Sequence, residues 1–303
     1  SISSIALNQI IVMFIIVFIG FICYKVKLIN EESNKTLSNI LLMLVNPIVI
    51  FTSYQREFSK ELLHGLLISL ILAVITHAFA IFISNVLLRK DPFFKKKDHD
   101  KENSNNPDVA IERFSAIYSN CGFMGIPLVN GIFGSEGVFY LTAYMTIFNF
   151  LIWTHGVIMI AGKQDKKQTI KMLLSPTVFA TILGFLLFIL QVQFPKNVLE
   201  AFNYLSSLNT PIAMLVAGVT IARTKIAKAF LKIRVYYTTF IKLIVIPIIV
   251  LLLYSRFPID RPVLLTAVLA VACPTAATGT LFAIRYDKNA LYASELFAIS
   301  TIF

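Results

Sequence analysis

The hydrophobic residues of this chain occur in long runs that are separated by short polar stretches. The runs lie near residues 5–24, 35–54, 62–88, 111–131, 137–161, 173–194, 198–222, 235–255, 261–284 and from 290 onward. A full run is about twenty residues long, the length of a helix that crosses the ~30 Å hydrocarbon core of a bilayer. None shows the alternating ~10-residue pattern of a membrane β-barrel strand. The pattern predicts an all-α integral membrane protein with ten transmembrane helices. Because the last run reaches Phe303 after about 13 residues, we expect the native helix to continue past this sequence.

Composition and cysteine usage fit this class of protein. Hydrophobic residues make up 57% of the 303 positions and charged residues 14%, whereas soluble domains carry about 25% charged residues. The mean hydropathy is +0.78. All three cysteines lie in or beside hydrophobic runs, which argues against a disulfide framework. The first run has no basic segment before it and no small-residue cleavage site after it, so we expect a retained span rather than a signal peptide.

The basic residues are distributed unevenly between the connections. Of the 27 Lys and Arg, 21 lie in the connections after spans 1, 3, 5, 7 and 9, five lie in the other connections, and Lys242 lies within span 8. Positive charge collects on the cytoplasmic loops of membrane proteins. The distribution therefore predicts a multi-pass plasma-membrane protein with cytoplasmic basic loops and two extracellular termini. It also explains the net charge of +11 without a nucleic-acid partner.

The two halves of the chain share a pattern of prolines. Span 2 contains LVNPIVIF and span 7 contains LNTPIAML, while spans 4 and 9 each carry a proline among small residues. Pro127 follows Pro47 by 80 residues and Pro274 follows Pro211 by 63, and the charged insertion 90–110 accounts for the difference. Because each half has five spans, the second half would enter the membrane from the opposite side. The pattern predicts two inverted five-helix repeats, at residues 1–161 and 173–303, as in many secondary transporters.

Spans 4 and 9 contain residues that interrupt helices. SNCGFMGIPLVNGIFG lies in span 4 and CPTAATG in span 9. A helix broken within a membrane leaves backbone groups unpaired, which is tolerated only where protein or a water-filled cavity receives them. We expect Pro127 and Pro274 to begin second half-helices, whose N-termini carry partial positive charge. Two such ends meeting near the midplane of the bilayer predict an anion-binding site.

Several segments match a known family. GFICYKVKLINEESNKTLSNILLMLVNPIVIF resembles the first two helices of the auxin efflux carrier family, which includes plant PIN carriers and bacterial permeases for malate and malonate. SNCGFMGIPLVNGIFG resembles the family's first crossover, and PTAATGTLFAIRYDKNALYASELFAISTIF is similar to its second crossover and last helix. The resemblance covers nearly the whole chain.

The resemblance implies a ten-helix fold like those of the antiporter NhaA and the bile-acid symporters. Helices 1, 2, 6 and 7 would form a scaffold, and helices 3–5 and 8–10 a moving unit that carries substrate by an elevator-type displacement, commonly in a homodimer. Substrate would bind where helices 4 and 9 cross. The expected binding residues are Asn120, Cys121, Gly122, Met124, Pro127, Cys273, Pro274, Thr275 and Thr278. The chain departs from the family's pattern at Gly279, where relatives often have Asn, and at Glu295, where they usually have an apolar residue.

Three ionisable residues within the predicted spans have more than one interpretation. Lys242 lies about 12 Å deep and either extends back to the cytoplasmic surface or acts as a countercharge for an organic anion. His77 is either a neutral core histidine or a proton-coupling group. Glu295 is an interfacial carboxylate, a partner of Lys242 or the carrier of a coupling proton.

The sequence contains no motif for metal, cofactor or covalent chemistry. HExxH, paired C-x-x-C, P-loop and nucleophile-elbow patterns are all missing from it. We therefore predict a secondary transporter, not an enzyme, that carries small organic anions such as malate or indole-acetate-like carboxylates without a cofactor or metal. Two alternatives stay open: a sodium-coupled carrier, and a sensor that binds ligand without transporting it.

Overall fold

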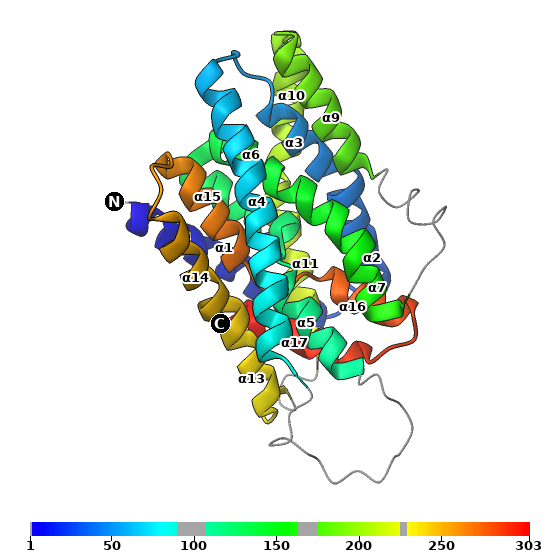
Figure 1. The fold of residues 1–303 in the computed structure, drawn as a ribbon. Helices are drawn as coiled ribbons and strands as arrows, with labels where there is room; N and C mark the ends of the chain where they lie inside the picture. Colours follow the sequence, from blue (N-terminus) through cyan, green and yellow to red (C-terminus); the bar gives the residue numbers. More distant parts are fainter. Residues whose placement is uncertain (1, 90–106, 163–174, 225–228) are drawn as a thin grey trace.

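The structure, a computed structural model, describes residues 2–89, 107–162, 175–224 and 229–303. This part of the chain is helical apart from its connections (Figure 1). The α-helices and the π-helical turns (η) are α1 (Ile2–Lys25), α2 (Glu31–Ile40), η1 (Leu41–Val45), α3 (Asn46–Ser53), α4 (Lys60–Leu87), α5 (Pro107–Ile117), η3 (Cys121–Gly125), α6 (Ile126–Leu151), η4 (Ile152–Gly156), α7 (Val157–Ala161), α9 (Pro176–Ile189), α10 (Lys196–Ser207), α11 (Asn209–Arg223), α13 (Ile233–Phe240), η5 (Ile241–Val245), α14 (Ile246–Tyr254), α15 (Arg261–Ala272), α16 (Thr278–Arg285) and α17 (Ala290–Ile302).

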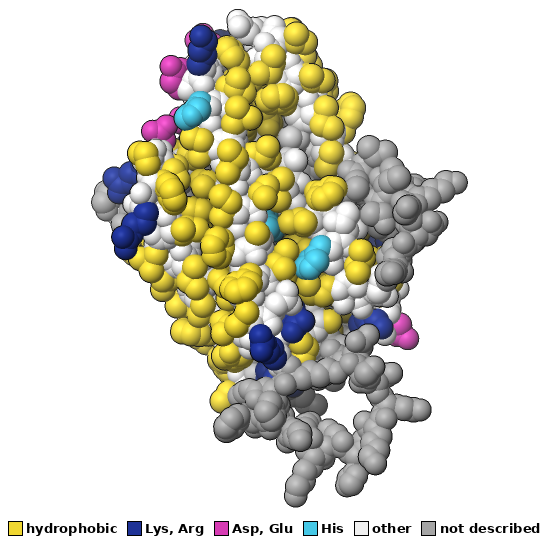
Figure 2. Space-filling view, in the orientation of Figure 1, with side chains coloured by type: hydrophobic (Ala, Val, Ile, Leu, Met, Phe, Trp, Pro, Cys, Tyr) yellow, Lys and Arg dark blue, Asp and Glu magenta, His cyan; other side chains and the backbone are white. Residues whose placement is uncertain are grey.

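Within the described residues, six helical segments are long and apolar enough to cross a membrane. They are Ser4–Lys25, Glu31–Ser53, Lys60–Leu87, Cys121–Ala161, Lys196–Arg223 and Ile233–Tyr254. Three shorter apolar helices, α9, α15 and α17, accompany them. Figure 2 shows hydrophobic side chains over most of the visible face, with most charged side chains near its edges. The predicted all-helical membrane architecture is confirmed.

The helices agree with the hydrophobic runs to within a few residues, with two local differences. α5 begins at Pro107, so helix starts inside the predicted insertion 90–110, whose residues 90–106 lie outside the described part. α9 ends at Ile189 although the hydrophobic run continues to 194. Gln191 takes a positive φ of 55°, a left-handed conformation that ends helices.

A sharp turn divides α6 into two parts. Gly134 has φ +63° and ψ −155° within what is otherwise one helix. Glycine adopts this conformation readily because it has no Cβ. Residues 126–133 therefore belong to the second half of span 4, and residues 135–151 begin span 5. The predicted connection between these spans is reduced to a turn.

Prolines lie just after three of the π turns. η1, η3 and η5 are followed within two residues by Pro47, Pro127 and Pro247. A proline ring clashes with the carbonyl four residues earlier and offers no N–H. The wider π turn relieves this conflict, so each helix continues through its proline.

Helices α1 and α11 pack backbone against backbone. A Cβ placed on Gly218 would lie 2.0 Å from the Val17 carbonyl oxygen, and one placed on Gly20 would lie 2.5 Å from that of Leu215. Small residues allow this approach in membrane helices, where dispersion and not hydrophobicity drives association. The first and seventh predicted spans are thus joined firmly.

The two predicted sets of connections lie at opposite ends of the molecule. Figure 1 shows the α3–α4 connection and the α9–α10 turn at the upper end. The end of α4 and the start of α13 lie at the lower end. These four places alternate between the two ends as predicted, and the assignment of one end to the cytoplasm stays a prediction.

Candidate functional site

The two interrupted segments lie against each other in the fold. Ser119 and Thr275 form an isolated antiparallel β-bridge. Beside it, the Asn120 N–H donates to the Pro274 carbonyl at 2.7 Å, and a second backbone bond of 2.9 Å joins the flanking residues on the other side. Each break therefore provides partners for backbone groups that the other leaves unpaired, as a buried backbone requires.

The second half-helices begin at different distances from the breaks. In the first, helix resumes at once with η3 at Cys121, so Pro127 lies inside the helical segment. In the second, the chain stays non-helical until α16 begins at Thr278, four residues after Pro274. The prediction that each proline begins its half-helix is wrong at Pro274; Pro127 does lie in the first turn of α6, but the π turn η3 already precedes that turn. A π turn accommodates Pro127 within a helix, whereas Pro274 uses its carbonyl to bind Asn120.

Lys242 lies at this crossing and is completely buried. Its Nζ donates to Ser119 Oγ at 2.5 Å and to the Val271 carbonyl at 3.1 Å. Val271 belongs to the last turn of α15, where helical carbonyls carry partial negative charge. The ammonium faces neutral acceptors, and the salt bridges among the described residues do not include it. The interpretation that Lys242 extends to the cytoplasmic surface is therefore wrong.

Two of the expected binding residues have polar atoms without a partner. Within the described part of the chain, Asn120 Nδ2 and Thr278 Oγ1 are buried and form no hydrogen bond. Buried polar groups are almost always paired, so these two atoms are exceptions at the crossing. Thr275 differs, because its Oγ1 donates to the Ser115 carbonyl at 3.0 Å and its N–H donates to Ser300 Oγ at 3.1 Å.

The other expected binding residues pack around the crossing. Cys121, Met124 and Cys273 are buried, and both cysteines are free thiols. The carbonyls of Gly122 and Pro127 accept hydrogen bonds of 3.4 and 3.2 Å from side chains of neighbouring helices. These residues form the walls of the crossing, and their side chains add no charge to it.

A pair of asparagines beside the crossing was missed by sequence reasoning. Asn209 Nδ2 donates to Asn46 Oδ1 at 2.7 Å, and Asn46 Nδ2 donates to the Gly122 carbonyl at 3.4 Å. Both asparagines precede the prolines of LVNPI and LNTPI, so the repeated motif contained the signal. The pair joins spans 2 and 7 to the first interrupted helix.

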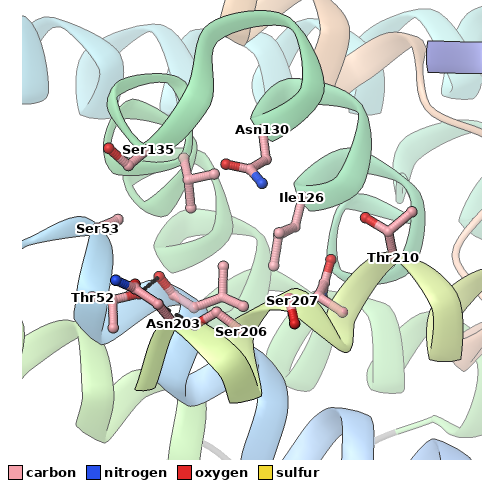
Figure 3. A pocket seen from close by; sticks show the side chains of 12 residues that line it. Thr52, Ser53, Ile126, Asn130, Ser135, Asn203, Ser206, Ser207 and Thr210 are labelled. Carbon is pink, nitrogen blue, oxygen red and sulfur yellow. Dashed lines mark hydrogen bonds between the residues drawn. The ribbon is translucent and has the colours of Figure 1, made fainter. Parts of the chain in front are cut away.

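A polar cavity of about 280 Å³ lies next to this pair, between α3, α6, α10 and α11. Figure 3 shows Asn130 and Ile126 of α6 facing Ser206 and Ser207 across it. Its lining has hydroxyl, amide and aliphatic side chains but no charged one, and includes Thr52, Ser53, Asn130, Ser135, Asn209 and Thr210. Asn209 connects the cavity to the crossing.

His77 is buried within α4. Its Nδ1 lies 2.8 Å from the Ala73 carbonyl, and its ring centroid lies 4.7 Å from that of Tyr144. Nε2 forms no hydrogen bond within the described part. The backbone contact and the ring packing fit a neutral core histidine, and a coupling role stays a prediction.

Glu295 is fully buried and pairs with Lys232, whose Nζ lies 2.5 Å from its Oε2. The predicted pairing of Glu295 with Lys242 is therefore wrong. Ten residues separate the two lysines, which is about 15 Å along a helix. Lys232 precedes α13 and reaches the start of α17, whereas Lys242 lies deeper, at the crossing.

Glu112 is a second buried carboxylate that sequence reasoning did not select. Arg234 holds it with Nε and Nη2 at 2.5 and 2.7 Å, and the Tyr292 hydroxyl donates to it at 2.6 Å. Its only sequence signal was a carboxylate at the start of a predicted span. No group of three His, Cys, Asp or Glu among the described residues is arranged to hold a metal ion.

Comparison with known proteins identifies the family. A family model described as membrane transport protein matches residues 5–303. The uncharacterized transporter YfdV of Escherichia coli K12 is 24% identical over 299 residues, which cover 95% of this chain and 90% of the relative. The uncharacterized transporter MJ1031 of Methanocaldococcus jannaschii is 25% identical over 226 residues, covering 72% and 70%. An uncharacterized transporter of Methanothermobacter thermautotrophicus is 24% identical over 297 residues, covering 95% and 91%. The chain belongs to the membrane transport protein family, the auxin efflux carriers that its motifs resemble, and is a transport protein rather than an enzyme.

Proposed function

We propose that this chain is a secondary transporter that moves small organic anions, such as malate or indole-acetate-like carboxylates, across the membrane. Family membership provides the class of activity. The single observation that carries the choice of substrate is Lys242, a buried ammonium at the meeting point of two interrupted helices. The substrate would bind at this crossing.

The charge of Lys242 favours an anionic ligand. An ammonium inside a membrane protein needs nearby negative charge or dipoles, because removal from water is unfavourable by several kcal/mol. The Ser119 hydroxyl and the Val271 carbonyl offset part of that cost. No carboxylate among the described residues lies within salt-bridge distance. A substrate carboxylate would complete the neutralisation, so the crossing would select anions over neutral or cationic solutes.

Directional contacts for a carboxylate are also present. Asn120 directly precedes η3, and Thr278 is the first residue of α16. Both have unpaired polar atoms, and the N-termini of the helices that they precede or begin favour negative charge. In this proposal Lys242 provides charge, while Asn120 and Thr278 orient the bound group.

We propose further that the chain forms two inverted five-helix repeats. The Ser119–Thr275 bridge joins the interrupted segment of one half to that of the other, and the Asn46–Asn209 hydrogen bond joins the two Asn–Pro motifs. The bridge is antiparallel, as expected for segments related by an axis in the membrane plane. These contacts support the repeat that the prolines predict.

The proposed mechanism is an elevator-type movement of one unit against another. Helices α1 to α3 and α9 to α11 would be the scaffold, with the close α1–α11 contact making it rigid. Helices α4 to α7 and α13 to α17 would move with the substrate. The polar cavity lies between α6 of the moving unit and α3, α10 and α11 of the scaffold. It adjoins the end of α3 and the Gly134 turn, both on the predicted extracellular side. A homodimer in the plasma membrane, with basic connections in the cytoplasm, completes the proposal.

Uptake of labelled malate and indole-3-acetate into proteoliposomes tests the function. We expect saturable uptake by the wild type and a roughly fivefold lower affinity for Asn120→Ala, since one hydrogen bond contributes about 1 kcal/mol. Asn39→Ala, at an exposed asparagine of α2, is the matched control. Absence of flux for every carboxylate tried, with folded protein, would contradict the proposal.

The same assay separates the alternatives. Sodium sites use clustered oxygens, often from carboxylates, and the salt-bridge partners of the described residues bring no carboxylate to Lys242. We therefore expect equal uptake with and without sodium. Sodium dependence would identify a sodium-coupled carrier, and binding without uptake would favour a sensor.

A further inference from the structure

Arg56 lies at the rim of the polar cavity, in the connection between α3 and α4. Its Nε donates to the Ser53 carbonyl at 2.8 Å, and its Nη2 donates to Ser135 Oγ at 2.8 Å. Ser53 and Ser135 both line the cavity. The guanidinium is thus bound to two lining residues, one from α3 and one from α6.

The guanidinium is held in a defined position. It lies over the Phe139 ring, 5.1 Å from the centroid, and such stacking favours the planar arginine group. An arginine has five N–H donors, and the two bonds to serines leave three. The guanidinium is therefore oriented and still able to bind a carboxylate through two parallel hydrogen bonds.

Arg56 forms no salt bridge with the described residues. Partial burial lowers the pKa of Arg56 from its ordinary value, while the nearby Glu136 and Tyr140 raise it. An arginine remains cationic at any physiological pH. The cavity lining itself is uncharged, so Arg56 brings positive charge to its rim, where Glu136 partly opposes it.

The size of the cavity restricts the ligand. Its volume of about 280 Å³ lies near the lower end of the ~300–1,000 Å³ range of small-molecule pockets. Hydroxyl and amide groups line it and suit a hydrated or hydroxylated solute. A small carboxylate with its first waters fits this description better than a large apolar acid.

We propose that Arg56 is an outer recognition residue, which binds the carboxylate of a small organic anion in this cavity before the anion reaches the crossing. This inference rests on the proposed transport of organic anions. It adds a second positively charged position, at the cavity that Asn209 also lines, and makes Arg56 a determinant of apparent affinity.

The competing role for Arg56 is purely structural, as a link between α3 and α6 that we call a latch. Its two hydrogen bonds join α3 to α6, so it could act only by holding the scaffold against the moving unit. A latch would change turnover, and Ser135→Ala would reproduce its loss. A recognition residue would change KM, and Ser135→Ala would have little effect because the charge remains.

Proteoliposome uptake of malate, measured as KM and maximal rate, distinguishes these roles. For Arg56→Gln we expect KM to rise about tenfold, because a charged hydrogen bond contributes about 1.5 kcal/mol or more. The maximal rate should stay within about twofold. Arg56→Lys should recover part of the affinity, since the charge is kept but the paired geometry is lost. Salt should weaken wild-type uptake at low malate more than it weakens Arg56→Gln uptake. Arg256→Gln, an exposed arginine on the same predicted side, is the matched control.

The outcomes separate this inference from the function on which it rests. A raised KM for Arg56→Gln alone supports recognition. Wild-type transport with an unchanged KM in Arg56→Gln would overturn the inference and leave the proposed function intact. Equal losses of maximal rate in Arg56→Gln and Ser135→Ala, without a change in KM, would overturn it in favour of the latch. Absence of any carboxylate transport by the wild type would overturn both.

Discussion

Buried charges have oppositely charged partners at the end of the molecule where α13 begins, whereas the buried charge at the crossing has neutral ones. At that end, Glu112 is held by Arg234, and Glu295 is held by Lys232. At the crossing, Lys242 is equally buried, but its hydrogen-bond partners among the described residues are a hydroxyl and a carbonyl. One chain therefore contains both compensated and uncompensated charges at similar burial.

The difference indicates separate tasks for the two regions. One ion pair joins α5 to α13, and the other joins α17 to the residue just before α13. Removing one partner of a buried pair usually destabilises a protein. A buried charge without a carboxylate lowers stability unless something binds it. We infer that the end near α13 serves folding and that the crossing serves ligand binding.

Lys242→Met should have the largest effect, and on substrate affinity. Loss of a hydrogen bond to a charged group corresponds to about 1.5–3 kcal/mol, or a roughly 10- to 150-fold weaker interaction. The unfolding temperature should not fall, because methionine fills similar space without a buried charge, and Ser119 Oγ keeps a 3.2 Å bond to the Val271 carbonyl. Carboxylate uptake and thermal unfolding in detergent measure the two quantities. Lys60→Met, at an exposed lysine, is the control, and wild-type affinity in Lys242→Met would break the comparison.

Glu112→Gln should show the opposite pattern. It removes the charge that Arg234 and Tyr292 bind, and Arg234 is only 24% exposed. We expect a loss of about 1.5–3 kcal/mol in the free energy of unfolding with little change in the KM of uptake. Thermal unfolding checks this, with the exposed Glu200→Gln as control. Unchanged stability would show that this pair does not hold the helices.

Thr275 and Thr278, in the interrupted segment of span 9, should show the same contrast between stability and ligand affinity with smaller effects. Thr278→Val removes a hydroxyl without a partner, so we expect affinity to fall about fivefold and stability to stay constant. Thr275→Val removes a hydroxyl that donates to the Ser115 carbonyl, so we expect a loss of about 1 kcal/mol in stability and a smaller change in affinity. Ligand titration and thermal unfolding of both variants test the contrast. A reversed pattern would exchange their roles.

Glu295→Gln should have the smallest effect. Lys232 is 41% exposed, so its charge can be solvated when the carboxylate is removed, and partly exposed pairs contribute little. We expect a loss of about 1 kcal/mol or less in the free energy of unfolding. A loss as large as that of Glu112→Gln would show that the exposure of the basic partner does not determine how much an ion pair contributes to the free energy of unfolding.

Local sequence patterns predicted the spans and the places where they break. Prolines and glycines inside SNCGFMGIPLV and CPTAATG contradict a regular helix, and the chain leaves helical geometry just before the first segment's glycines and throughout most of the second segment. The restart points could not be derived, because they depend on the pairing of Ser119 with Thr275, which are far apart in the sequence. The π turn at Cys121 and the extended segment at Pro274 are two ways to provide hydrogen-bond partners for the backbone of an interrupted helix.

The meeting of the two interrupted segments was predictable from the sequence, but their contacts were not. The depth of Lys242 along span 8 followed from helical rise, yet its partner Ser119 lies 123 residues away. A pairing of Glu295 with Lys242 was predicted because both residues lie in predicted spans. In the structure, the packing of α13 and α17 brings Glu295 to Lys232 instead. Glu112 and Arg234 are separated by 122 residues, so no periodicity in either helix indicated their pairing.

Thermal unfolding of the purified protein with increasing carboxylate concentration tests the central claim most directly. A ligand that binds the folded state raises the unfolding temperature with concentration. Across a panel that includes malate, malonate and indole-3-acetate, the account predicts that at least one compound stabilises the wild type and that the same compound, at the same concentrations, does not stabilise Lys242→Met. Equal stabilisation of the two proteins would contradict it.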